Sequence, residues 1–298
     1  MRMRNRRLGL GIGLVLAVGI ACVATVAPAA FGKKGPGGTM TKAGDGRVSL
    51  RRLQGVNFIG NCRFSHRAPD DPIVSPEKPG ASHDHSFVGN RTTNAFSTLD
   101  SLLGGRTTCR RSGETAAYWM PTLYVDGSAV APTEATIYYR RRTLKSVTAP
   151  PAGFKMIAGD SMASAPQGQG VTFWNCGLAV NLPASSAPPA CPAGRGSALR
   201  LHVTFPSCWN GVSLDSPNHK QHVAYPMNGR CPSGYDVAIP QISLIYRYPV
   251  TGSHGFALAS GSVYSAHADF FNAWDQNALA GLVDSCLNGL RHCGARGS

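Results

Sequence analysis

The stretch TLYVDGSAVAP, residues 122–132, carries the clearest fold signal in the chain. Asp126 and Gly127 form an Asp-Gly pair between two strand-like arms, a pattern that predicts a β-hairpin. Short aromatic and β-branched runs bounded by turn-forming residues recur throughout the chain. They include NFIGNCRFSH, AAYWMPTLYVDG, TIYYRRR, GFKMIAGD, VTFWNCGL, ALRLHVTFP, QISLIYRYPV and FALASG. We therefore expect a mostly β protein, a single-domain β-sandwich or jelly roll of short strands.

Helical patterning is confined to two segments. Residues 269–290, DFFNAWDQNALAGLVDSCLNGL, place apolar side chains at roughly helical spacing, and Asp269 is a suitable N-cap. These features predict a C-terminal α-helix that begins at Asp269. A shorter helix is expected within residues 92–103, TTNAFSTLDSLL.

The composition suits a loop-rich extracellular β protein. Only 15% of residues are charged, and the chain contains 35 glycines and 21 prolines. The net charge is +14, but much of it lies in the N-terminal region. No stripe of Lys and Arg is interleaved with aromatic residues, so we do not expect nucleic-acid binding. Acidic glycans or the cell surface are more natural partners for an exported basic protein.

The N-terminal region predicts export. Residues 1–30 have a basic head, an apolar run and small residues around Ala27 to Ala30, the pattern of a cleaved signal peptide. Two alternatives are retention of the apolar run as an anchor and lipidation of Cys22. Residues 31–53 are polar, Gly-rich and basic, and we expect a flexible linker there. Residues 54–298 are expected to form one secreted, monomeric domain with no membrane attachment after cleavage.

The cysteines predict disulfides. Eight remain when Cys22 is set aside, and an even number in an exported chain is typical of a disulfide framework. No paired CxxC knuckles occur, which argues against a thiolate zinc site. We expect sequential pairing, in which each bond closes a local loop: Cys62–Cys109, Cys176–Cys191, Cys208–Cys231 and Cys286–Cys293.

The first candidate for chemistry is GASHDHSFVGN, residues 80–90. On a strand, His83 and His85 point to one face and Asp84 to the other. Two imidazoles on one face can bind a divalent metal such as zinc or copper, or act as an acid/base pair. An ordinary strand with hydrogen-bonded histidines is the alternative at this stretch.

The second candidate is CWNGVSLDSPNHKQHVAYP, residues 208–226. It gathers Trp209, Asp215, His219 and His222 in one segment, and the two histidines share a face only in a helical turn. A surface loop held by Cys208–Cys231 is the plainer interpretation.

The third candidate is YSAHADFFNAWD, residues 264–275. His267, Asp269 and Asp275 flank aromatic residues that include Trp274, and aromatic rings beside carboxylates are typical of sugar-binding sites. A helix cap and core aromatics would explain the same residues. Trp119, in YWMPTLY, is either a core residue or one that reaches a cleft.

Five stretches in order carry a family resemblance: FIGNCRFSHRAPDDPIV, GASHDHSFVGN, AAYWMPTLYVDG, FPSCWNGVSLDSPNHKQHVAYP and YSAHADFFNAWD. From about Val56 to Cys293 the chain resembles a family of secreted bacterial and fungal proteins known as a domain of unknown function. The chain has NAWD where the family pattern is NGWD. In fungi such domains can accompany cell-wall or carbohydrate-binding modules, so the resemblance implies a polysaccharide context without naming a reaction.

We expect a secreted carbohydrate-active protein that cleaves a cell-wall or plant polysaccharide. Hydrolysis would need two carboxyl groups, whereas elimination would use an imidazole base and a cation that neutralises the sugar carboxylate. The excess of imidazoles favours elimination. The catalytic candidates are His83, His85, Asp215, His222, His267 and Asp269, and the substrate-binding candidates are Trp119, Trp209, His219, Trp274 and Asp275.

The alternative function is a non-catalytic metal-binding or glycan-binding protein of the cell envelope. The metal candidates are His83 and His85, and the ion would be zinc, copper or calcium. A serine hydrolase is not expected because the G-x-S-x-G motif is absent.

Overall fold

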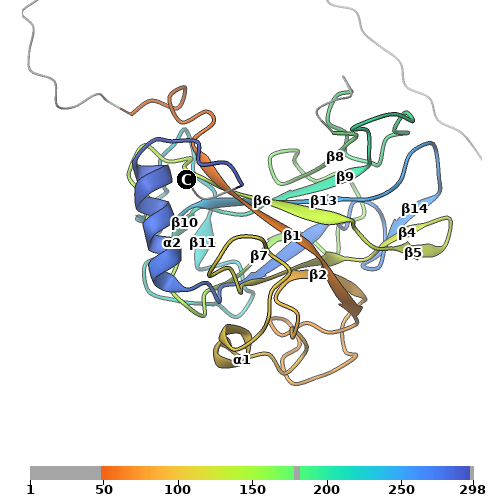
Figure 1. The fold of residues 1–298 in the computed structure, drawn as a ribbon, viewed down its shortest axis with the longest axis horizontal. Helices are drawn as coiled ribbons and strands as arrows, with labels where there is room; N and C mark the ends of the chain where they lie inside the picture. The colour runs from red at the N-terminus through yellow and green to blue at the C-terminus, as the bar shows by residue number, and fades with distance from the viewer. Residues whose placement is uncertain (1–47, 178–181, 296–298) are drawn as a thin grey trace, which may run out of the picture. The chain divides into compact units, whose positions relative to one another are not determined.

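A long strand, β1 (Asn57–Ala68), organises the fold in this computed structural model, which describes residues 48–177 and 182–295 (Figure 1). Its first part, from Asn57 to Arg63, pairs with β6, and its last part, from Phe64 to Ala68, pairs with β2. The register shifts between Phe64 and His66, and such bulges bend a strand. One strand therefore serves both halves of a sheet that folds over on itself.

The main sheet has nine strands, in the order β7-β15-β3-β2-β1-β6-β13-β9-β8, and every pairing in it is antiparallel. Its other strands are β2 (His85–Gly89), β3 (Ala117–Pro121), β6 (Glu134–Arg140), β7 (Lys155–Gly159), β8 (Thr172–Asn175), β9 (Arg200–Thr204), β13 (Gln241–Arg247) and β15 (His267–Phe271). Because β7 and β9 also approach each other, the sheet is nearly closed, and the predicted β-sandwich class is confirmed.

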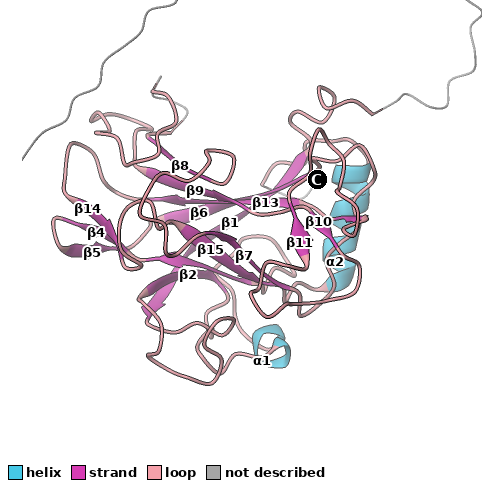
Figure 2. Ribbon diagram, turned by 180° about the vertical axis from the view of Figure 1, so that it is seen from behind, coloured by secondary structure: helices cyan, strands magenta, loops and turns pink. Residues whose placement is uncertain are grey.

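Two small sheets flank the main one (Figure 2). The first consists of β10 (Cys208–Trp209), β11 (Val223–Ala224) and β12 (Val237–Ala238), and the second of β4 (Leu123–Val125), β5 (Ser128–Val130) and β14 (Phe256–Leu258). The predicted Asp-Gly hairpin is confirmed between β4 and β5. Asp126 and Gly127 both have positive φ, 48° and 79°, as this tight turn requires.

The largest hydrophobic cluster lies inside the folded sheet. The rings of Phe58 and Tyr139 stack at 4.6 Å, and Trp274 Nε1 donates to the Tyr139 hydroxyl at 2.9 Å. The strand β6 alternates buried and partly exposed residues, a clearer pattern than its sequence suggests. Residue Leu53 is only 2% exposed and belongs to this cluster, so the folded part begins before Gln54.

A second, smaller cluster covers the opposite face of β2, β3, β7 and β15. It consists of Ile73, Phe87, Leu102, Ala117, Trp119, Ile157, Phe271 and Ala273. The strands β2, β3 and β15 are consequently buried on both faces along their whole length. This second face carries the candidate site.

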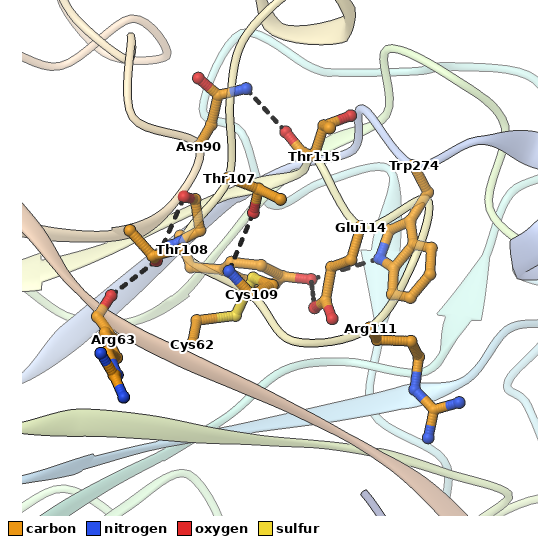
Figure 3. Close-up of a disulfide and its surroundings, with 12 residues drawn as sticks. Cys62, Arg63, Asn90, Thr107, Thr108, Cys109, Arg111, Glu114, Thr115 and Trp274 are labelled. Carbon is orange, nitrogen blue, oxygen red and sulfur yellow. Dashed lines mark hydrogen bonds between the residues drawn. A yellow bond between two sulfur atoms is a disulfide. The ribbon is translucent and has the colours of Figure 1, made fainter. Parts of the chain in front are cut away.

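All four predicted disulfides are confirmed: Cys62–Cys109, Cys176–Cys191, Cys208–Cys231 and Cys286–Cys293. Figure 3 shows the first of them beside the core residues Glu114 and Trp274. The predicted signal peptide, its cleavage site and Cys22 lie outside the described residues. Within residues 48–177 and 182–295, no helix has the length and apolar character needed to cross a bilayer.

The C-terminal helix is confirmed, but its predicted start at Asp269 is wrong. Asp269 lies in β15, where it pairs with both β3 and β7, and α2 (Gln276–Leu282) begins after the cap residue Asp275. The carboxylate of Asp275 accepts a hydrogen bond from the Ala278 amide. A π-helical turn, η1 (Val283–Asn288), continues α2, and the short predicted helix is α1 (Leu99–Leu103).

Candidate metal centre

The strand β15 presents two polar side chains to the second face of the sheet. His267 and Asp269 are two residues apart and share this face, while Ala268 and Phe270 belong to the main core. Asp269 is paired with Trp119 of β3, which is in turn paired with Phe87 of β2. In the sheet, β15 and β2 are therefore separated by β3 alone.

Three imidazoles meet at this point. His85 begins β2, and His83 reaches the same place from the segment before the strand. The ring centroids of His83 and His85 lie 4.3 Å apart, and those of His85 and His267 lie 5.8 Å apart. The Nε2 atoms of His83 and His267 are 3.1 Å apart. Two nitrogens bound to one ion at about 2.1 Å lie roughly 3.0–3.4 Å apart at right-angled to tetrahedral geometry.

Backbone carbonyls fix the tautomers of two of these rings. His85 Nδ1 lies 3.0 Å from the Asp70 carbonyl oxygen, and His267 Nδ1 lies 2.9 Å from that of Ser265. A carbonyl can only accept, so both Nδ1 atoms carry the proton and both Nε2 atoms present lone pairs. This is the arrangement of metal-ligating histidines. Among the described residues, the buried His85 Nε2 has no hydrogen-bond partner.

Two carboxylates complete the cluster. Asp269 is 0% exposed, and neither of its oxygens has a hydrogen-bond partner in the described part of the chain. Asp71 is also buried, but its Oδ1 accepts from the amides of Ile73 and Val74, both at 2.9 Å. Donor atoms of Asp71, His85 and Asp269 lie within 4.8 Å of one another, as do those of His83, His85 and His267. His85 is common to both groups.

The electrostatics of the protein alone disfavour charge at this cluster. Burial, reinforced by the charge of Asp71, raises the pKa of Asp269 well above its usual range, although Lys220 opposes the shift. Burial also lowers the pKa of His267 to about 4, and it holds the pKa of His85 well below its usual value. Neutral imidazoles beside an unpaired carboxyl group form a donor set that a cation would satisfy.

A pocket of about 540 Å³ opens onto the cluster. Its wall includes four cluster residues, namely Asp71, His83, His267 and Asp269. The opposite side comes from the segment between β10 and β11 and includes His219 and Lys220. The cluster is therefore accessible from one side, although Asp269 is fully buried at the base of the wall and the buried His85 is not part of it.

The segment of residues 214–222 contains three more of the predicted residues. His219 Nδ1 lies 2.8 Å from Asp215 Oδ1, and His219 lines the pocket. The third residue, His222, is not part of the pocket wall. It is 1% exposed, and its two nitrogens bond to Ser216 Oγ at 2.9 Å and the Lys155 carbonyl oxygen at 2.7 Å. We assign it to the support of this segment.

The remaining predicted residues lie outside the pocket wall. Trp119 is fully buried in the second cluster, its ring 6.5 Å from His85. Trp209 donates from Nε1 to the Ser213 carbonyl and packs on Phe154. Trp274 lies in the main core and Asp275 caps α2, so we leave both out of the site.

The site residues predicted from the sequence did not include Asp71 or Lys220. Asp71 stands in RAPDDPIV, where the sequence indicates only a turn residue. It does act as a turn residue, because its carboxylate accepts hydrogen bonds from two backbone amides. Lys220 reaches the pocket because its Nζ donates to the Gly159 carbonyl oxygen at 2.6 Å, a contact that depends on tertiary structure.

One further cluster of potential metal ligands cannot be a metal site. Cys62, Cys109 and Glu114 lie close together, but both sulfurs belong to a disulfide and cannot act as thiolate ligands (Figure 3).

Comparison with known proteins identifies the family. Residues 71–274 match the model of the Domain of unknown function (DUF1996), and this match starts at Asp71 and includes His83, His85, His267 and Asp269. No curated protein and no solved structure matches the chain. The chain belongs to the DUF1996 family.

Proposed function

We propose that this protein is an exported, metal-dependent enzyme that cleaves an acidic polysaccharide by elimination. One observation carries the proposal: the buried Asp269 carboxyl group has no partner among the described residues and adjoins an equally unpartnered His85 Nε2. Leaving two such groups unsatisfied costs roughly 1–3 kcal/mol each, and more when one is charged. A bound ligand that interacts with both groups would remove this free-energy cost.

The donor set favours a transition metal over calcium. His83, His85 and His267 would supply Nε2 atoms, and Asp269 would supply carboxylate oxygen. Imidazole suits zinc, copper and related ions, whereas calcium takes oxygen ligands. When bound, such an ion supplies a positive charge that can neutralise a sugar carboxylate. Asp71 lies close enough to add a further oxygen or to accept from a bound water.

The arrangement supports elimination better than hydrolysis. Hydrolysis needs two carboxyl groups that reach the glycosidic bond, and Asp269 is fully buried while Asp71 is engaged by two backbone amides. Elimination from a uronic acid needs positive charge at the sugar carboxylate and a base at the neighbouring carbon. The cluster and Lys220 lie on one pocket and would supply the charge.

Export rests on the disulfides and the N-terminal sequence. Four disulfides in one domain are typical of oxidising compartments, and the predicted signal peptide precedes them. Acidic polysaccharides of the cell wall or of plant material are the substrates that this proposal assigns to the exported protein.

A non-catalytic metal-binding protein is the second candidate. The complete burial of His85 and Asp269 favours it, since structural metal sites are closed whereas catalytic sites keep an open position. The pocket beside His83 and His267 favours the enzyme.

Metal analysis and a glycan panel together test both candidates. We expect one zinc or copper ion per chain after reconstitution, and weaker retention of this ion in His267→Ala and Asp269→Asn. His254→Ala is the matched control, because His254 is a surface residue bonded to Asp126 and the Thr251 carbonyl. Alginate and polygalacturonate should yield products with the absorbance of unsaturated uronates, and a chelator should abolish this.

The outcomes separate the candidates. Stoichiometric metal with no product from any acidic or neutral glycan would favour the non-catalytic protein. Neither metal nor product would refute both. Product formation that is insensitive to chelator and to His267→Ala would place the active site elsewhere.

A further inference from the structure

The segment of residues 214–222 is attached along the free edge of β7. The Lys155 amide donates to the Leu214 carbonyl oxygen at 2.9 Å, and the Ile157 amide donates to that of His219 at 3.2 Å. Lys220 Nζ adds its bond to the Gly159 carbonyl at the end of the strand. Edge strands need such cover, and here the cover also fixes the segment beside the pocket.

This attachment places His219 on the same pocket as the candidate metal centre. Ile157, which binds the His219 carbonyl, is paired with Asp269 on its other side. Neighbouring strands lie about 4.8 Å apart, so the backbones of His219 and Asp269 are separated by roughly 10 Å. Both residues line the same pocket. The pocket of about 540 Å³ that they line is the place where a sugar would bind.

His219 is held in an orientation that leaves one ring nitrogen without a hydrogen bond among the described residues. Its φ is 57°, a left-handed conformation that is uncommon for residues other than glycine and often marks functional sites. Asp215 Oδ1 accepts from His219 Nδ1 at 2.8 Å and from the Ser216 amide at 2.7 Å. No bond to His219 Nε2 is found within residues 48–177 and 182–295.

The charge of Asp215 is maintained by its neighbours. Burial raises its pKa, but the bonds from His219 and the Ser216 amide outweigh this effect and hold the pKa below the usual value. A carboxylate that accepts from Nδ1 fixes the proton there and leaves a basic lone pair on Nε2. This is how a carboxylate orients a histidine for proton transfer.

Two other histidines show what distinguishes this pair. His222 uses both nitrogens in structural bonds. His254 forms the same kind of contact with Asp126, at 2.7 Å, but its second nitrogen bonds to the Thr251 carbonyl, and it is not part of the pocket wall. Of these three, only His219 combines a carboxylate on Nδ1 with a free Nε2 in the pocket.

We propose that His219, oriented by Asp215, is the catalytic base of the pocket, an inference that rests on the proposed function. His219 Nε2 takes the proton from C5 of a uronic acid. The electron pair of the C5–H bond forms the C4=C5 double bond, and the C4–O bond breaks with its pair on oxygen. That oxygen then takes a proton from water, and the histidine returns its own proton to solvent, so no oxidant or reductant is needed.

His219→Gly is the sharpest test. Glycine adopts positive φ without strain, so the variant should fold, and it leaves space for a small base. We expect product formation from polygalacturonate or alginate to fall by roughly 10²–10⁴-fold, with metal content unchanged. Added imidazole should restore part of the rate, a result that a purely structural role would not give. Asp215→Asn should also lose rate but should not respond to imidazole.

His254→Gly is the matched control and should keep the wild-type rate with or without imidazole. Wild-type-like turnover in His219→Gly, or a loss that imidazole does not relieve, would overturn the assignment of the base while leaving the proposed function intact. A metal-loaded wild-type protein that releases no product from either polymer would refute the proposed function, and the base assignment with it.

Discussion

Replacing Asp269 with asparagine should stabilise the metal-free protein and reduce the stabilisation that a bound metal gives. Asparagine has the shape of a protonated aspartate and carries no charge. In the metal-free protein, burial raises the pKa of Asp269 well above its ordinary value of 3.8. The folded state therefore holds a proton that the unfolded state releases as the pH rises, and stability is lost over that range.

The size of the effect follows from this linkage. Below about pH 4 both forms of residue 269 are neutral, so wild type and Asp269→Asn should have similar free energies of unfolding. Above that pH, the variant should gain on wild type by up to about 1.4 kcal/mol per pH unit, until the folded-state carboxyl ionises. At pH 7 the limit is about 4 kcal/mol, from about three pH units at this slope.

Zinc should narrow this difference between wild type and Asp269→Asn. A ligand that binds only the folded state, at a thousand times its dissociation constant, stabilises by about 4 kcal/mol. Asp269→Asn lacks one donor, and a tenfold to hundredfold loss of affinity would remove about 1.4–2.7 kcal/mol of that gain. The bound ion would thus offset part of the free-energy cost of the buried carboxylate.

Urea unfolding of stripped and zinc-loaded protein between pH 4 and 8, followed by tryptophan fluorescence, measures both effects. Glu114→Gln is the matched control. Burial raises the pKa of Glu114 to about 7, so stripped wild type should also lose stability relative to this variant as the pH rises from about 4.5 to about 7, but zinc should affect both equally. A difference between wild type and Asp269→Asn that is independent of pH, or an equal response to zinc, would refute the reasoning.

Three further predictions concern the scaffold. Replacing Cys208 and Cys231 with alanine should lower the free energy of unfolding by about 3 kcal/mol, since their bond spans a separation of 23 residues, and should lower pocket activity because it frees the segment that carries His219. His222→Ala, checked by urea unfolding and metal analysis, should destabilise by roughly 2–3 kcal/mol without loss of metal, because two buried bonds are broken. Asp275→Ala should cost about 1 kcal/mol in the same assay through loss of a helix cap, and an unchanged midpoint would contradict this.

Features set by local sequence could be predicted well. The β4–β5 hairpin depends on Asp126 and Gly127, whose positive φ angles the sequence itself favours. Each disulfide joins two cysteines that follow one another in the sequence, so each bond closes a segment with no other cysteine inside it. Such pairings require little knowledge of the tertiary structure.

The strand β15 shows where local reasoning fails. HADFFNAW contains an N-cap residue and apolar side chains at near-helical spacing, so a helix starting at Asp269 was the natural prediction. Pairing with β3 and β7 on both sides overrides that preference. A strand buried on both faces also lacks the polar–apolar alternation by which strands are recognised.

The difficulty of recognising buried strands also explains why only part of the site could be predicted from the sequence. His83 and His85 were predicted to act together because they are two residues apart, yet only His85 lies within β2. Their partners His267 and Asp269 have the same spacing, and placing these on a strand would have shown that they share a face. The meeting of the two pairs depends on β3, which lies between β15 and β2 and is distant from both in sequence.

The contrast between His219 and His222 could not be predicted at all. The two histidines lie in one segment, and their spacing says nothing about which nitrogen each would leave free. The edge of β7 makes the distinction: the Lys155 carbonyl takes up the second nitrogen of His222, whereas at Ile157 the edge is satisfied by the backbone carbonyl of His219. Because His219 meets the strand through its backbone, its imidazole remains available to the pocket, and a single hydrogen-bonding edge thus separates a structural histidine from a candidate base.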